Sequence, residues 1–223
     1  YPKSGRTWLR FMLSSAGVEL LFAHAGAENS EANLLEEIRD GPAKWRDWRV
    51  VFLFRDPRDT VVSSYFQATK RLKASKRFGG TIGDFLRSPR YGLAKIAGFN
   101  LLWLESASHF RDFTAVSYED LHKDAPGELA RVIRFATGKP ADERKVRHAV
   151  DAGRFENMRK MESALGGKMN ERTKLGGADP GDLESLKTRK GKVGGWRDYF
   201  DEADAAYMDG MLQEMDYWRR VGA

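Results

Sequence analysis

The sequence predicts an α/β fold, with a mostly parallel central sheet flanked by helices and a ligand at the carboxyl ends of the strands. Apolar runs of strand length alternate with helical segments along the chain. One run, residues 50–54, is apolar at every position, as in a strand buried on both faces. The chain also opens on a glycine-containing, P-loop-like loop ahead of a helical segment, which is typical of anion sites in such folds.

Length and composition indicate a globular protein. The 223 residues fit one domain, and we expect residues 1–223 to form a single domain. With 38 basic and 32 acidic side chains, the net charge is +6, which suits an anionic ligand. The two signs are interleaved, which argues against nucleic acid. No apolar run is long enough to span a membrane. The absence of cysteine excludes disulfides and thiolate metal ligands and fits a cytoplasmic protein.

The opening loop, residues 1–8 (YPKSGRTW), combines a lysine, two hydroxyls and a glycine before an apolar helical run. The free N–H groups of a helix start and the charge of Lys3 together favour a phosphate or sulfate. An ordinary capped helix after a turn is the alternative. The loop does not match the Walker pattern, because Lys3 precedes Gly5. No apolar strand precedes Tyr1, so we expect that the first strand of the sheet is missing.

Two further strands are expected before the middle of the chain. Residues 19–24 form a short apolar run with His24 at its end, and residues 50–54 form the buried run that ends at Arg55. A charged side chain there faces the crevice in which open sheets bind ligands. Pro57 suits the first position of the next helix, which carries Ser63. Taken alone, Arg55 could instead pair with Asp56 or Asp59, and Ser63 could be a surface serine.

The rest of the chain continues the alternation. We expect a long helix over residues 92–111, a strand over 113–118 that ends at Tyr118, and amphipathic helices over 127–137 and 142–150. Phe155 follows them. Arg189, Lys190 and Gly191 then supply two cations and a glycine that permits close backbone approach. Without context, such a basic run is usually a solvated face.

Three of these blocks resemble the sulfotransferases that use 3′-phosphoadenosine 5′-phosphosulfate (PAPS). Residues 1–8 are similar to the family's 5′-phosphosulfate loop, YPKSGTTW, and differ only at Arg6. Residues 55–65 (RDPRDTVVSSY) and 189–196 (RKGKVGGW) match two further blocks in the same chain order. The resemblance therefore spans nearly the whole chain.

The resemblance implies transfer of a sulfuryl group from PAPS to a hydroxyl, or an amine, of a small-molecule or carbohydrate acceptor. Adenosine 3′,5′-bisphosphate (PAP) would be released, and no metal would be needed. In the family a histidine between the first two blocks takes the acceptor proton, and His24 is the histidine in that interval. Lys3 would stabilise charge on the leaving group.

The resemblance also implies the cofactor-binding residues. Trp8, Tyr118 and Phe155 would adjoin the adenine, while Arg55, Ser63 and Arg189 would hold the 3′-phosphate. The full set is Lys3, Ser4, Gly5, Arg6, Thr7, Trp8, Arg55, Ser63, Tyr118, Phe155, Arg189, Lys190 and Gly191.

The sequence departs from the family at two positions and leaves two other functions open. Phe22 replaces a lysine of cytosolic members, and Gly153 replaces a threonine near the adenine. A P-loop kinase acting on a small molecule is one alternative, although its Walker lysine is missing. A catalytically degenerate nucleotide binder is the other.

Overall fold

The computed structural model describes residues 1–28, 32–177, 179 and 181–222. The chain divides into two compact units, each built from separate stretches of sequence. Unit 1 combines Tyr1–Ser4, His24–Ala115 and Val193–Ala223, and unit 2 combines Gly5–Ala23 and Val116–Lys192. The single domain remains a prediction.

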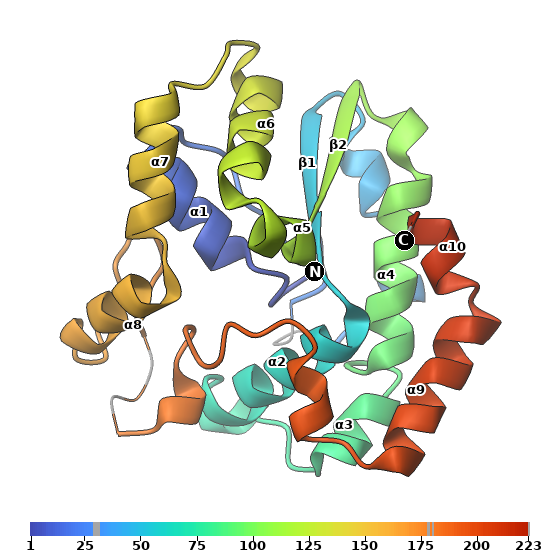
Figure 1. The fold of residues 1–223 in the computed structure, drawn as a ribbon. Helices are drawn as coiled ribbons and strands as arrows, with labels where there is room; N and C mark the ends of the chain where they lie inside the picture. Colours follow the sequence, from blue (N-terminus) through green and yellow to red (C-terminus); the bar gives the residue numbers. More distant parts are fainter. Residues whose placement is uncertain (29–31, 178, 180, 223) are drawn as a thin grey trace. The chain divides into compact units, whose positions relative to one another are not determined.

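Unit 1 contains the sheet and most of the longer helices. Strands β1 (Arg49–Phe54) and β2 (Asp112–Ser117) pair as a small parallel sheet, and the last residues of β2 belong to unit 2. Figure 1 shows the two strands side by side with helix α4 next to them. The helices of unit 1 are α2 (Pro57–Lys70), α3 (Ile82–Arg87), α4 (Leu93–Glu105), α9 (Glu202–Glu214) and α10 (Tyr217–Val221), with 3₁₀ helices η1 (Glu36–Ile38), η2 (Pro42–Trp45), η3 (Ala74–Lys76), η4 (Ala107–His109) and η6 (Gly195–Asp198).

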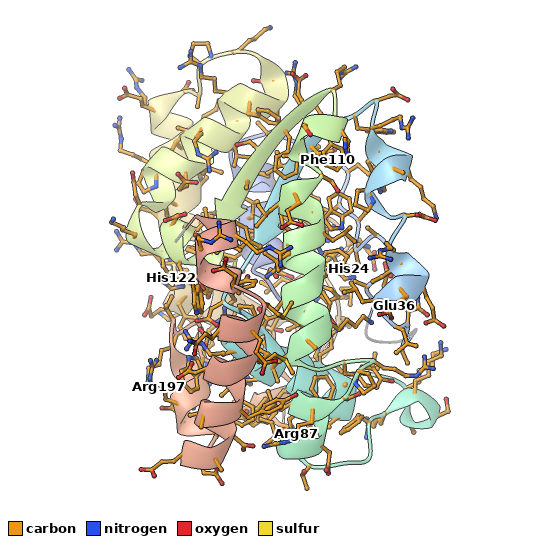
Figure 2. All side chains as sticks on the ribbon, turned by 90° about the vertical axis from the view of Figure 1, so that its right-hand side faces the viewer. His24, Glu36, Arg87, Phe110, His122 and Arg197 are labelled. Atoms are coloured by element: carbon orange, nitrogen blue, oxygen red, sulfur yellow. The ribbon has the colours of Figure 1, made fainter. Side chains whose placement is uncertain are left out.

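An aromatic core fixes unit 1 around α4. This helix packs against β1, α2, α9 and α10. The Phe52 ring of β1 stacks on Trp103 of α4 at 5.6 Å between centroids, and Trp103 stacks on Phe110 at the same distance. Arg87 and Phe110 lie near opposite ends of α4 (Figure 2). Offset stacking of this kind adds to the free energy gained by burying the rings.

Local sequence signals account for the elements that present the candidate site in unit 1. The apolar run of residues 50–54 forms β1, as predicted, but within it only Phe52 is fully buried, so the strand is not buried on both faces along its length. Asp56 then caps α2 by accepting from the backbone N–H of Arg58 at 2.9 Å, and Pro57 occupies the first helical turn. The predicted helix over 92–111 ends earlier, at Glu105. Ser106 folds its hydroxyl back onto the carbonyl of Leu102 there, at 2.7 Å, and η4 follows.

Unit 2 is helical. Its members are α1 (Arg6–Ser15), α5 (Tyr118–Lys123), α6 (Ala125–Thr137), α7 (Glu143–Ala152) and α8 (Phe155–Ala164), with the 3₁₀ helix η5 (Leu183–Ser185). Helix α1 buries Leu9, Met12 and Leu13 and packs against α6 and α7, which lie beside it in Figure 1. The two predicted amphipathic helices are confirmed as α6 and α7.

The predicted fold class is confirmed, with one strand prediction wrong. Residues 19–24 adopt no strand, although the run is apolar. Leu21 is 69% exposed, so the run is not buried as a sheet strand would be. The Phe22 ring instead lies under the Arg10 guanidinium, 4.4 Å from its centroid. Among the described residues, no helix combines the length and apolar character that a membrane crossing requires.

Candidate cofactor and catalytic residues

The opening loop leads into α1 through two left-handed residues. Lys3 has φ 71° and Gly5, the N-cap of α1, has φ 98°. A Cβ at Gly5 would lie 2.5 Å from Cδ2 of Tyr118, so glycine is required by both backbone and space. Among the described residues, no side chain caps the start of α1, and its first turn carries no acidic residue. The helix therefore begins with N–H groups and a dipole suited to an anion.

Ser4 precedes this helix start and supplies a buried hydroxyl. Its side chain is 1% exposed, and its Oγ has no hydrogen-bond partner within the described part of the chain. A buried hydroxyl without a partner costs about 1–3 kcal/mol. An oxyanion placed at the loop would satisfy this donor, so the residues present fit a phosphate or sulfate group.

In unit 1, the carboxylate of Asp59 contacts both Arg55 and the backbone at the start of η6. Arg55 follows β1 and is 9% exposed, and its Nη2 lies 3.3 Å from Oδ2 of Asp59. Asp59 also accepts from the backbone N–H groups of Gly194 at 2.8 Å and Trp196 at 2.9 Å. The ion pair with Asp59 that the sequence left open is thus observed. Ser63 lies one turn further along α2 and is partly exposed.

His24 begins the second stretch of unit 1 and has a carboxylate near it. Its Nδ1 lies 3.9 Å from Oε1 of Glu28, and its side chain is 14% exposed. Figure 2 places His24 to the side of α4, toward the 3₁₀ helix that carries Glu36. The carboxylate is therefore close enough to orient the imidazole and to pair with it when the ring takes up a proton.

Trp8 and Tyr118, two predicted adenine contacts, are brought together in unit 2. Their ring centroids lie 5.7 Å apart, and His122 contacts both rings, at 5.0 and 4.7 Å. The indole N–H of Trp8 donates to the carbonyl of Gly153 at 2.9 Å. A Cβ at Gly153 would lie 2.8 Å from Cγ of Met12, so glycine lets α1 approach this carbonyl.

Phe155 and Gly191 are likewise brought together in unit 2. Gly191 has φ 61°, and a Cβ there would lie 2.5 Å from Cδ2 of Phe155. The stretch ahead of Gly191 is held by Glu162, which is 3% exposed and accepts from the N–H groups of Lys187 and Thr188 at 2.9 and 2.8 Å. The hydroxyl of Thr188 donates to the same carboxylate at 2.7 Å.

Arg189 contributes a guanidinium that already has an acidic partner. Its Nη1 lies 3.2 Å from Oε2 of Glu184, and its carbonyl accepts weakly from Arg159 at 3.5 Å. Its side chain is 13% exposed, so the guanidinium is well shielded from water.

Sequence reasoning missed the two buried carboxylates and His122. In the sequence, Asp59 is only a possible partner of Arg55, and Glu162 and His122 belong to no motif. The signal for Glu162 is weak, because an acidic residue on a helix is normally exposed. The position of His122, one helical turn after Tyr118, could have suggested a contact between the two rings.

The α/β fold and the loop before α1 fit a class of protein that binds a phosphate or sulfate group, and the comparisons with known proteins identify the family. The model of the sulfotransferase domain matches residues 41–217. Sulfotransferase 2A6 of Mus musculus is 28% identical over 96% of this chain and 81% of its own length. Cytosolic sulfotransferase 12 of Arabidopsis thaliana is 27% identical over 83% of this chain, which spans about half of that relative, 53%.

Solved sulfotransferase and retinol dehydratase structures have a similar fold. Mouse sulfotransferase SULT7A1 complexed with PAP superposes with a TM-score of 0.63 at 19% identity, over 98% of this chain and 82% of that one, which supports the fold. Retinol dehydratase with androsterone and the inactive cofactor PAP gives a TM-score of 0.54 at 26% identity, over 75% of this chain and 47% of that one. The chain belongs to the sulfotransferase family.

Proposed function

We propose that this chain transfers a sulfuryl group from PAPS to a hydroxyl of a small-molecule acceptor and releases PAP. Membership of the sulfotransferase family supports the reaction class, and two solved relatives hold PAP. One observation carries the proposal for this chain itself. The buried Ser4 hydroxyl stands without a partner among the described residues, immediately before the uncapped start of α1, as an anion-binding loop requires.

We propose that the residues assigned by the sequence bind the cofactor. Lys3, Ser4 and the start of α1 would hold the phosphosulfate, since donors and positive charge gather there. Arg55 and Ser63, with Arg189, would hold the 3′-phosphate, and the planar guanidinium suits that group. Trp8, Tyr118 and Phe155 would stack near the adenine. The remaining members of the set are Gly5, Arg6, Thr7, Lys190 and Gly191.

In the proposed reaction, bound PAPS supplies the sulfuryl group and the leaving group. His24 takes the proton from the acceptor hydroxyl, and the nearby Glu28 carboxylate stabilises the imidazolium that forms. Lys3 would stabilise the negative charge that the leaving oxygen of PAPS gains when the acceptor oxygen replaces it on sulfur. The backbone N–H groups of the loop would donate hydrogen bonds to that charge and so replace the water that otherwise solvates it.

We propose that the acceptor is a small lipophilic alcohol. Retinol dehydratase was solved with androsterone and with retinol, and one relative from Cavia porcellus is named 3-beta-hydroxysteroid sulfotransferase. These ligands belong to those proteins, and the extension to this chain is tested by an acceptor panel of hydroxysteroids, retinoids, phenols and carbohydrates. Sulfation of the carbohydrates alone would overturn the lipophilic acceptor class.

We also propose a cytoplasmic location. The sequence has no cysteine, which suits a reducing compartment, and one relative is named a cytosolic sulfotransferase. Fractionation of cells that express the tagged chain tests this proposal, and enrichment in a secreted or membrane fraction would overturn it.

The decisive experiment is calorimetric titration with PAP, using ADP as the matched ligand without a 3′-phosphate. We expect PAP to bind at least about 10-fold more tightly than ADP, because a charge-assisted hydrogen bond contributes about 1.5–3 kcal/mol. Equal affinities would remove the 3′-phosphate roles. Magnesium-dependent ATP turnover would favour the small-molecule kinase, and PAPS binding without turnover across the acceptor panel would favour the degenerate binder.

A further inference from the structure

Asp59 is a buried carboxylate with three partners, all in unit 1. It lies on α2, is 3% exposed, and uses both oxygens. Oδ2 accepts from the N–H of Gly194 at 2.8 Å and lies 3.3 Å from Nη2 of Arg55, while Oδ1 accepts from the N–H of Trp196 at 2.9 Å. Hydrogen bonds to an ionised acceptor are about twice as strong as neutral ones. One side chain thus connects Arg55 to residues 194–196, at the carboxyl-terminal end of the 189–196 block.

The turn held by Asp59, residues 194–196, combines a left-handed backbone with a buried indole ring. Gly194 has φ 72°, and Trp196 is 4% exposed. The Trp196 ring lies under two guanidinium groups, those of Arg58 at 4.7 Å and Arg197 at 4.3 Å. These cation–π contacts fix the indole but leave the backbone N–H groups of the turn to be satisfied by Asp59.

A second carboxylate anchors the other end of the same stretch, within unit 2. Glu162 accepts from the N–H groups of Lys187 and Thr188 and from the Thr188 hydroxyl. The chain between the two anchors, residues 189–193, carries Arg189, Lys190 and Gly191. It passes from unit 2 to unit 1 after Lys192. Residues 189–193, which we call the bridge, are therefore held at each end by a buried acidic side chain.

We propose that Asp59 is a positioning residue of the cofactor site, which fixes the carboxyl-terminal end of the 189–196 block and the Arg55 guanidinium in a single arrangement. This inference rests on the proposed function, because Arg55 and the block are the groups assigned to the 3′-phosphate. Asp59 itself need not touch the cofactor. Its effect is to remove the freedom that Arg55 and the bridge would otherwise lose when PAP binds.

The test is Asp59→Asn, which keeps the size of the side chain. The amide retains one acceptor oxygen, so one of the two N–H groups of the turn loses its partner, and the ion pair between Arg55 and residue 59 is lost. We expect PAP affinity to fall on the order of 10- to 100-fold, as misplaced binding groups cause. The KM for PAPS should rise more than the KM for the acceptor. Asp59→Glu keeps the charge and should recover part of the loss.

The proteolysis of the unliganded protein gives a readout that needs no cofactor. Trypsin cleaves after lysine and arginine, and the bridge offers Arg189, Lys190 and Lys192. In Asp59→Asn we expect cleavage there to be several-fold faster than in the wild type, because the turn opens more often. Asp84→Asn is the matched control, since the Asp84 carboxylate lies in the same unit and accepts from the N–H and hydroxyl of Thr81 in the capping box of α3, away from the bridge.

The outcomes separate the two proposals. If the wild type does not bind PAP, the proposed function fails, and the trypsin rates still decide whether Asp59 holds the bridge. If Asp59→Asn matches Asp84→Asn in trypsin sensitivity, the anchoring role is overturned. If the bridge is cleaved faster while PAP affinity stays at the wild-type value, the positioning role is overturned.

Discussion

Gly191→Ala should weaken cofactor binding through Phe155. Gly191 has φ 61°, where an alanine costs roughly 1–2 kcal/mol, and the new Cβ would lie 2.5 Å from Cδ2 of Phe155. The Phe155 ring must therefore move. If that ring stacks on the adenine, its displacement should cost part of the roughly 1–3 kcal/mol that base–aromatic stacking contributes, which is about 5- to 150-fold in PAP affinity.

Gly138→Ala separates the backbone cost from the contact with the ring. Gly138 ends α6 with φ 71°, and no atom lies within 4 Å of the Cβ position. In urea unfolding, the backbone cost should lower the free energy of unfolding of both variants by about 1–2 kcal/mol. For Gly191→Ala the clash with Phe155 should lower it further. Only Gly191→Ala should lose PAP affinity in calorimetry.

Phe155→Ala sets the limit of the effect. If the ring is the sole cause, Gly191→Ala should approach the PAP affinity of Phe155→Ala without falling below it; a lower affinity would show that the added methyl group also blocks the backbone approach of residue 191 to the cofactor. If Gly191→Ala binds PAP as tightly as Gly138→Ala does, Phe155 does not contact the adenine, and the steric argument for Gly191 is refuted.

Three further predictions concern Lys3, His24 and Lys95. Lys3→Ala should lower kcat on the order of 100-fold or more in steady-state assays, as loss of transition-state charge stabilisation does; a change in KM alone would assign Lys3 to ground-state binding. His24→Ala should abolish transfer while calorimetry shows nearly wild-type PAP binding, and a fully active variant would remove His24 from the proton transfer. Burial lowers the pKa of Lys95 to about 8 from 10.5, although Glu37 and Glu28 oppose this. Between these two pH values the unfolded chain binds a proton that the folded chain lacks, so this group makes stability rise with pH. Below pH 8 the buried charge destabilises the fold, and Lys95→Met should gain about 1–3 kcal/mol there after allowance for solvent screening. Urea unfolding at pH 7 and pH 10 checks this. If the free energies of unfolding of the wild type and Lys95→Met differ by the same amount at both pH values, the prediction is contradicted.

Short-range patterns were sufficient to predict much of the fold. The uniformly apolar run before Arg55 is a strand, and Asp56 and Pro57 start the next helix as their chemistry dictates. Residues 19–24 show the limit of this reasoning. Apolar composition does not make a strand without a partner strand, and Leu21 of that run is 69% exposed.

Long-range contacts explain what the sequence could not predict of the candidate site. The bonds from Asp59 to Gly194 and Trp196 join residues 135 and 137 positions apart. Asp59 carries only the local signal of an acidic residue in a first helical turn, which is common at any helix start. His122 is similar in part, because its contact with Trp8 depends on how α1 and α5 pack, whereas its contact with Tyr118 lies within α5.

The interleaved order of the two units has a consequence for synthesis on the ribosome. Unit 2 has all its residues once Lys192 has been added, whereas unit 1 still awaits Val193–Ala223. That last stretch brings Met208, Leu212 and Tyr217, which fill the same core as Phe99. Until it emerges, a nascent chain has every residue of unit 2 but lacks these side chains from the core of unit 1. A ribosome that stalls at this point would leave that core exposed, a state in which chaperones are needed to prevent aggregation.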